Sequence, residues 1–182
     1  MIRHTFKFLD AETLLLLYKS LIRPHVEYAT LLWSPHLKGD RDKIEKLQRR
    51  TTKLVPNLRD KPYEERLRVL KLPTLEFRRL RQDLILLYKH THHLIKLDTN
   101  TYCTCCRHNT NMLQPWLVGR RGHNLKYQIQ HHQGVRNRFF TSRVLKIWNK
   151  LHYNTVNAPS INPFKTQLLK DTSLPNQYSY TF

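Results

Sequence analysis

Apolar residues recur at helical spacing along most of this chain, and that pattern limits the folds open to it. Between Phe77 and Leu87 the apolar positions follow steps of three, four and three residues, and a similar rhythm returns between Phe140 and Leu151. This spacing places side chains along one face of an α-helix rather than on one face of a strand. Only four glycines occur in 182 residues, which argues against a turn-rich all-β fold. We therefore predict a mainly α-helical protein.

Capping residues and prolines set the expected helix ends. Asp10, Asp40, Thr74 and Ser160 are of the types that cap helix N-termini. Pro24 is expected to end the first helix, because proline disfavours helical geometry in the residue before it and lacks an N–H donor. The predicted helices span about residues 10–22, 25–32, 40–55, 62–70, 74–90, 140–151 and 160–170.

The apolar pattern also predicts which sides of these helices are buried. Leucines surround almost the whole circumference of the first helix, so it is expected to be buried on all sides. The inward stripe of helix 40–55 is predicted to be Ile44, Leu47, Thr51 and Leu54. Along helix 74–90 the expected inward residues are Phe77, Leu80, Leu84, Leu87 and Tyr88, with Arg78, Arg79 and Lys89 directed away.

The pattern divides the chain into four regions. Residues 1–92 are predicted to form a helical bundle, residues 93–115 a variable linker without apolar periodicity, residues 116–171 a smaller basic unit, and residues 172–182 a frayed tail. In the smaller unit, NLKYQIQHH and VRNRFF are expected to pair as a β-hairpin ahead of a helix. The predicted fold class is thus a helical bundle followed by a smaller α unit with a hairpin.

Charge is the strongest indication of a partner. The formal net charge is +19, and eleven basic residues but no carboxylate lie between Thr99 and Lys170. Such a stretch repels itself unless a polyanion or another protein region compensates it. A solubilising surface normally mixes both signs. We therefore predict RNA or DNA as the partner.

Two basic stripes are the candidate phosphate contacts. Lys43, Lys46, Arg50 and Lys53 repeat at helical spacing, and Arg143, Lys146 and Lys150 do the same near the C-terminus. An ordinary solvated helix face is the alternative for the first stripe. The residues predicted to bind nucleic acid are Lys43, Lys46, Arg50, Lys53, Arg136, Arg138, Arg143, Lys146 and Lys150.

The three tryptophans are candidates for stacking on bases. Trp148 falls on the apolar stripe of its predicted helix, which favours packing in the core. Trp116 lies in the irregular region after residue 93 and is the better stacking candidate, and Trp33 is a third.

Catalysis by this chain alone is not expected. Two-metal chemistry needs carboxylates held close together, whereas the seven aspartates include no adjacent pair, and Asp40 and Asp42 open a predicted helix. No phosphate-binding glycine loop, nucleophile elbow or H-E-x-x-H helix occurs. No cofactor or small-molecule substrate is predicted.

A cysteine-rich segment raises the question of a metal site. Cys103, Cys105, Cys106 and His108 offer the thiolate and imidazole ligands that zinc prefers. Their C-x-C-C-x-H spacing does not match the separated ligand pairs of zinc modules, so we predict a variable loop and no metal.

The cellular setting follows from the same composition. The three cysteines are clustered and odd in number, which disfavours a disulfide framework. The longest apolar run, Leu14–Tyr18, is far shorter than the ~20 residues of a membrane helix. We expect an intracellular protein, nuclear or cytoplasmic, that is neither secreted nor membrane-bound.

Several ordered motifs resemble one protein family. LYKSLIRPHVEYATLLWSPHLKGD, and the continuation from Asp42 to Lys89, are similar to the segment that follows the catalytic palm in reverse transcriptases of non-LTR retrotransposons. RRGHNLKYQ, VRNRFFTSRVLKIWNKL and VNAPSINPFKTQL resemble the closing segment of that family. The resemblance covers about 150 residues and is lost across residues 91–118.

The resemblance implies a helical thumb that holds a template–primer duplex by its backbone. The Y-A-D-D box that supplies the catalytic aspartates in the family is absent here, which implies a non-catalytic C-terminal remnant of an RNA-directed DNA polymerase. A truncated element, a gene-model fragment and a domesticated gene are all compatible with it. The alternatives are a free-standing basic RNA-binding protein and a protein-interaction piece that packs on the missing palm.

Overall fold

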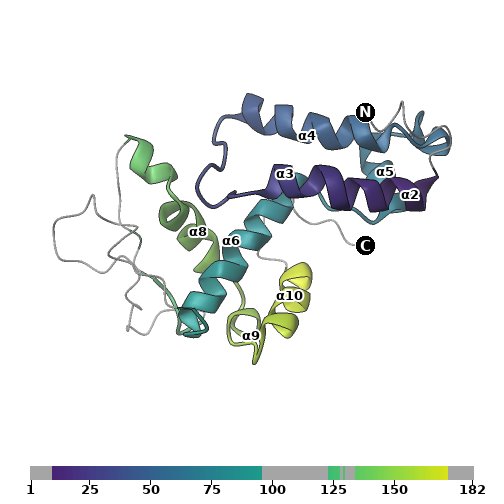
Figure 1. Cartoon of the computed structure of the whole chain (residues 1–182). Helices are drawn as coiled ribbons and strands as arrows, with labels where there is room; N and C mark the ends of the chain where they lie inside the picture. Colours follow the sequence, from purple (N-terminus) through teal and green to yellow (C-terminus); the bar gives the residue numbers. More distant parts are fainter. Residues whose placement is uncertain (1–9, 96–122, 128, 130–133, 172–182) are drawn as a thin grey trace. The chain divides into compact units, whose positions relative to one another are not determined.

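The protein is mainly α-helical, as the apolar pattern predicts. The computed structural model describes residues 10–95, 123–127, 129 and 134–171, and these contain no strand beyond a single bridge residue, Tyr127. Figure 1 shows the helices along the chain. They are α2 (Ala11–Leu17), the π-helix η1 (Tyr18–Ile22), α3 (Arg23–Glu27), α4 (Lys38–Thr52), the 3-10 helix η2 (Pro56–Leu58), α5 (Tyr63–Leu70), α6 (Leu75–Thr91), the 3-10 helix η3 (Gly134–Arg138), α8 (Phe140–Trp148), α9 (Tyr153–Val156) and α10 (Ile161–Lys170).

The described parts of the chain form two compact units. Unit 1 ends at Arg79 and unit 2 begins at Leu80, so the boundary falls inside α6. The predicted division instead assigns the whole of residues 1–92 to the first region. The second half of α6 joins unit 2 because its side chains pack there, as Tyr88 does against Phe164.

The first helix of unit 1 does not end at Pro24, contrary to expectation. Asp10 caps its start as predicted, accepting a hydrogen bond from the Thr13 N–H at 3.3 Å. The helix then widens into η1 and continues as α3, in which Pro24 occupies the first turn. A π-turn changes the hydrogen-bond register of a helix. Because a first turn needs no N–H donor from its residues, the proline is tolerated at the start of the new α-helical segment.

The second predicted helix is much shorter than expected. The sequence predicts it over residues 25–32, but α3 ends at Glu27 and Tyr28 is extended. Ala29 then adopts a left-handed conformation with φ 49°. A left-handed residue cannot continue a right-handed helix, so residues 28–32 form a turn instead.

Helix α4 differs from its prediction in its start and in its inward face. It begins at Lys38 with Leu37 as N-cap, so Asp40 lies in the first turn and is not the cap. Thr51 is buried as predicted, but Leu47 is exposed, and Gln48 and Thr52 are buried instead. Polar residues occupy the inward face because they find partners there, which an apolar-periodicity rule does not anticipate.

A polar network joins α4 to its neighbours in unit 1. The Tyr18 hydroxyl donates to Gln48 Oε1 at 2.9 Å, and Gln48 Nε2 donates to the Pro73 carbonyl at 2.9 Å. Glu45 accepts from the Tyr63 hydroxyl and from the Leu75 N–H. Each bond satisfies a group that would be costly to bury alone.

Apolar packing completes unit 1. The core cluster is Leu14, Tyr18, Val55, Leu58, Leu67, Leu70 and Leu72. Burying each large apolar side chain contributes roughly 1.5–3 kcal/mol.

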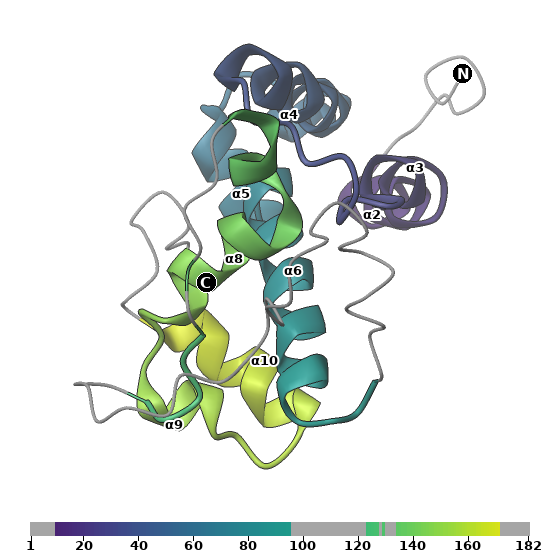
Figure 2. The ribbon, with the colours of Figure 1, turned by 90° about the vertical axis from the view of Figure 1, so that its left-hand side faces the viewer.

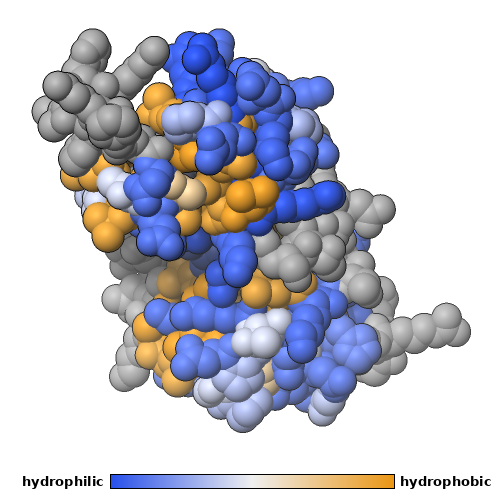
Figure 3. Space-filling view, turned by 90° about the vertical axis from the view of Figure 1, so that its right-hand side faces the viewer, coloured by the Kyte–Doolittle hydropathy of each residue, from blue (hydrophilic) through white to orange (hydrophobic). Residues whose placement is uncertain are grey.

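Unit 1 also leaves apolar side chains at its surface. Leu16 and Leu21 are 68% and 54% exposed, so the prediction that the first helix is buried on all sides is wrong. Figure 3 shows apolar patches between hydrophilic ones on one face of the molecule.

Unit 2 is built around the second half of α6. Figures 1 and 2 both place α10 beside this half of the helix, and the rings of Tyr88 and Phe164 stack with centroids 4.3 Å apart. Trp148 is fully buried, as predicted, and its Nε1–H donates to the Leu125 carbonyl at 2.8 Å. Phe164 and Leu168 of α10 are fully buried as well.

The predicted hairpin is not formed by its second segment. VRNRFF lies in η3 and at the start of α8, and parts of NLKYQIQHH lie outside the described residues. Tyr127 instead bonds to the Asn149 side chain at the end of α8, through its N–H at 3.0 Å and its carbonyl at 2.8 Å. The Asn149 amide thus bonds both backbone polar groups of Tyr127.

Candidate nucleic-acid interface

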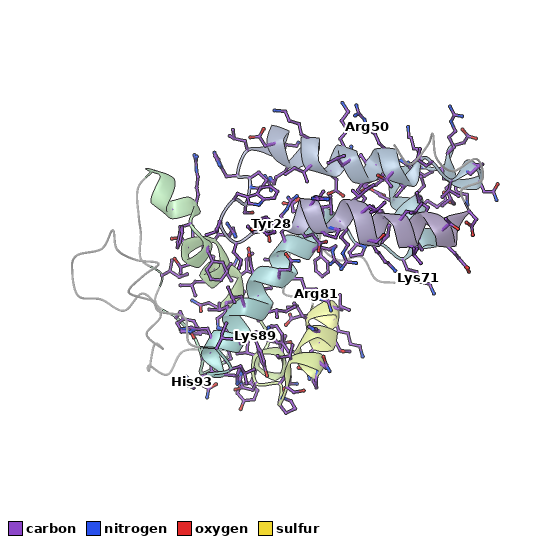
Figure 4. All side chains as sticks on the ribbon, viewed as in Figure 1. Tyr28, Arg50, Lys71, Arg81, Lys89 and His93 are labelled. Carbon is purple, nitrogen blue, oxygen red and sulfur yellow. The ribbon has the colours of Figure 1, made fainter. Side chains whose placement is uncertain are left out.

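The basic stripe of α4 lies on the side of the helix opposite its buried face. At 100° per residue, Lys46 and Arg50 each lie about 160° around the axis from Gln48, which is buried. Lys43 and Lys53 fall near the same line, and all four side chains are exposed. Figure 4 shows Arg50 on the outer side of α4, away from α2 and α3. The hydrogen bonds of Gln48 fix this orientation, because they hold the opposite face against the rest of unit 1.

The charge on this stripe is largely uncompensated. Lys43 pairs with Asp40 at 3.0 Å, but both side chains are well exposed and such a pair is weak. Among the described residues, no ion pair engages Lys46, Arg50 or Lys53. Lys53, the C-cap of α4, lies ten positions after Lys43, which corresponds to about 15 Å along a helix. Duplex nucleic acid carries about one charge per 1.7 Å of its axis, so several phosphates lie within the length of the stripe.

Three other arginines of unit 1 make contacts within the fold and are not exposed for binding a partner. The Arg66 guanidinium is buried, donates to the Arg49 carbonyl at 3.0 Å and lies over the Tyr63 ring. Arg78 bonds to the Glu27 carboxylate, and Arg79 is buried with its guanidinium 5.5 Å from the centre of the Trp33 ring. The prediction that Arg78 and Arg79 point away from the packed side is therefore wrong.

The pKa of Glu27 shows the electrostatic effect of Arg78 and of Arg23. Burial by itself raises the pKa of the Glu27 carboxyl, but hydrogen bonds and charge from Arg78 and Arg23 hold that pKa below its usual value. Glu27 therefore stays ionised and does not add an uncompensated negative charge to the surface of unit 1.

The C-terminal stripe is not a uniform basic face. The guanidinium of Arg143 pairs with the buried carboxylate of Asp83 at 2.8 Å, which links α8 to α6. Breaking that pair would leave an uncompensated buried charge, so Arg143 is a structural residue. Lys146 and Lys150 are exposed, as is Arg138. Arg136 belongs to η3, and its side chain lies outside the described residues.

The cysteine-rich segment, for which the sequence predicts a variable loop and no metal, is not tested by the structure. Cys103, Cys105, Cys106 and His108 lie outside the described residues, as does Trp116. Within the described parts of the chain, no group of three His, Cys, Asp or Glu side chains is arranged to hold a metal ion. The described helices likewise include none that combines the length and apolar composition of a membrane span.

Sequence reasoning missed Tyr28, which is 78% exposed at the end of α3. The sequence assigns Tyr28 to the helix predicted over residues 25–32. The predicted start of that helix is wrong because Pro24 is expected to end the preceding helix, and no sequence signal marks the left-handed turn at Ala29.

Comparison with known proteins identifies no relative. No protein-family model matches the chain, and neither the curated proteins nor the solved structures include a significant match.

Proposed function

We propose that this chain binds double-stranded RNA or DNA through the phosphate backbone, using the exposed basic face of α4. The observation that carries the proposal is the position of Lys43, Lys46, Arg50 and Lys53 on the side of α4 opposite its buried face. Phosphate contacts of this kind give affinity without reading sequence. Lys146 and Lys150 of unit 2 are further candidate contacts.

The motif resemblance gives this activity a context. It supports a C-terminal, thumb-like remnant of a non-LTR retrotransposon reverse transcriptase, whose ligand would be a template–primer duplex. The non-catalytic part of this proposal rests on the aspartates, which include no adjacent pair.

The test is the salt dependence of duplex binding. Each neutralised phosphate contributes about 0.7–0.9 to the slope of log affinity against log salt, so four contacts from α4 predict a slope magnitude of about 3. Changing Lys46→Gln together with Arg50→Gln removes two contacts and should lower the slope by about 1.4–1.8. Titration of a labelled RNA–DNA hybrid at several salt concentrations measures both values.

A charge-matched control separates the contribution of the α4 stripe to binding from that of the overall positive charge. Lys19→Gln with Arg68→Gln removes one lysine and one arginine from exposed positions elsewhere in unit 1. We expect that double variant to keep nearly the full slope. Equal slopes in both double variants, with unchanged circular dichroism, would show that α4 is not the phosphate-binding face.

A second candidate function is contact with another protein region. It is supported by the exposed Leu16, Leu21 and Leu37, which are costly to leave in water. An apolar contact of this kind persists at high salt, whereas phosphate binding weakens. Sedimentation of the protein at high salt therefore distinguishes the two functions: association that persists favours the apolar contact, and association that is lost favours phosphate binding.

A further inference from the structure

The turn after α3 presents aromatic and apolar side chains in an ordered form. Ala29 has φ 49°, and its carbonyl accepts hydrogen bonds from the N–H groups of Leu32 at 2.9 Å and Trp33 at 3.4 Å. Within the turn Thr30 is buried, while Tyr28 and Leu32 are 78% and 71% exposed. The left-handed region is strained for alanine, which carries a Cβ, so the surrounding contacts must hold the turn in this shape.

The indole of Trp33 is held in a fixed orientation within this turn. Its Nε1–H donates to the Tyr28 carbonyl at 2.5 Å, and the guanidinium of Arg79 lies 5.5 Å from the ring centre. The side chain nevertheless remains 41% exposed. Trp33 is thus coupled to the backbone of Tyr28, and this hydrogen bond does not involve the tyrosine ring.

The charge around the turn favours an anionic ligand. Residues 28–39 contain His36 and Lys38 but no carboxylate. The adjacent Glu27 is held by Arg23 at 3.2 Å and by Arg78 at 2.9 Å. A second copy of this chain would carry the same charge of +19, which opposes close self-association. Exposed aromatic rings in a cationic setting are the chemistry that holds unpaired nucleobases, by ring stacking with phosphate attraction.

We propose that Tyr28 and Trp33 form a stacking platform for unpaired bases of single-stranded RNA or DNA. This rests on the proposed function, since both require a nucleic-acid partner, but it assigns a different ligand form to a different surface. The basic face of α4 holds the phosphates of a duplex, and the turn takes the bases of a strand that has no complement.

The test compares single-stranded and duplex ligands on the full chain. Labelled oligouridine and oligothymidine serve as the RNA and DNA probes, and a blunt RNA–DNA hybrid serves as the duplex. Loss of one stacked base lowers affinity by about 5- to 150-fold. Tyr28→Ala should therefore weaken binding of one or both single strands by that factor and leave binding of the blunt hybrid unchanged.

Two matched variants test the chemistry of the contact. Tyr28→Phe keeps the ring and should bind single strands like the parent chain. Leu32→Ala removes an equally exposed apolar side chain from the same turn and should also have no effect. In addition, 2-aminopurine in the strand should lose fluorescence on binding to the parent chain but not to Tyr28→Ala.

Three results would overturn the stacking platform. The first is unchanged single-strand affinity in Tyr28→Ala. The second is an equal loss in Leu32→Ala, which would indicate a general apolar contact. The third is high-salt self-association abolished by both alanine variants, which would make the turn a protein-binding surface. Duplex binding by Lys46→Gln with Arg50→Gln is measured separately, so a failure of the α4 proposal is distinguished from a failure here.

Discussion

The buried imidazole of His123 shows how one residue ties the stability of unit 2 to pH. His123 is 2% exposed, and its Nε2 lies 3.0 Å from the Trp148 carbonyl. The neutral ring therefore carries its proton on Nε2 and donates it to that carbonyl. Nδ1 is buried and has no hydrogen-bond partner among the described residues. Burial, aided by the charge of Lys126, lowers the pKa of His123 despite the opposing effect of the Trp148 carbonyl.

The direction of that pKa predicts acid destabilisation. The unfolded chain takes up the proton near the ordinary histidine pKa of about 6.5, whereas folded His123 resists it. The free energy of unfolding should therefore be at its full value above pH 6.5 and fall below it, by up to about 1.4 kcal/mol per pH unit for this residue. His123→Gln keeps a donor for the Trp148 carbonyl but does not titrate, so it should show a shallower loss in urea unfolding between pH 7 and 5.

His90 contributes in the same direction, because burial and the nearby charge of His93 lower its pKa as well. Some pH dependence should therefore remain in His123→Gln. His25→Gln changes an exposed histidine of unit 1 and serves as the control. If His123→Gln and His25→Gln retained the same acid profile as the parent chain, His123 would not be the titrating group.

At the scale of the helices, the sequence predicted best where apolar side chains alone determine the packing. The predicted inward residues of α6 are all buried, Leu84 completely, and Trp148 on the apolar stripe of α8 is fully buried too. The pattern failed where hydrogen bonds determine the packing instead. Gln48 replaces Leu47 on the inward face of α4, because its amide satisfies groups from two other segments. No local rule reveals such partners.

The candidate site shows the same division. The four cations of α4 could be recognised from their spacing, since helical geometry places residues three and four apart on one face. The role of Arg143 could not, because Asp83 lies 60 residues away in the sequence and meets it only in the folded unit. Tyr28 became a candidate only once the left-handed turn at Ala29 was known.

The end of α5 offers a test of backbone strain at this scale. Lys71 has φ 50° and ψ 44°, and the next N–H, that of Leu72, bonds back to the Leu67 carbonyl at 2.9 Å. Glycine is the residue usually found at such a left-handed helix end. Lys71→Gly should raise the free energy of unfolding by about 0.5–1 kcal/mol, because it relieves the Cβ strain.

Lys71→Ala is the control for that substitution. It removes the same charge and side chain but keeps the Cβ, so it should not stabilise the protein. Chemical denaturation of both variants measures the difference. Equal stability of the glycine and alanine variants would mean that the left-handed turn carries no strain that glycine relieves.

At the scale of the whole molecule, the two units have separate cores connected through α6. Leu67 lies in the core cluster of unit 1, whereas Trp148 packs with the rings of His123 and Phe164 in unit 2. Local stability in a protein follows such cooperative groups of contacts. The basic face of α4 belongs to unit 1, so its shape should not require an intact core in unit 2.

Substitution of one core residue in each unit tests this independence. Trp148→Ala should destabilise unit 2 by roughly 3–5 kcal/mol, the usual cost of emptying a large aromatic site. Amide hydrogen exchange should then accelerate in α8 and α10, while Thr51 and Thr52 of α4 keep their protection. Leu67→Ala should cost roughly 2–5 kcal/mol and produce the reverse pattern. Faster exchange in both units of each variant would show instead that α6 couples them into one cooperative fold, and nucleic-acid binding by α4 would then depend on unit 2 as well.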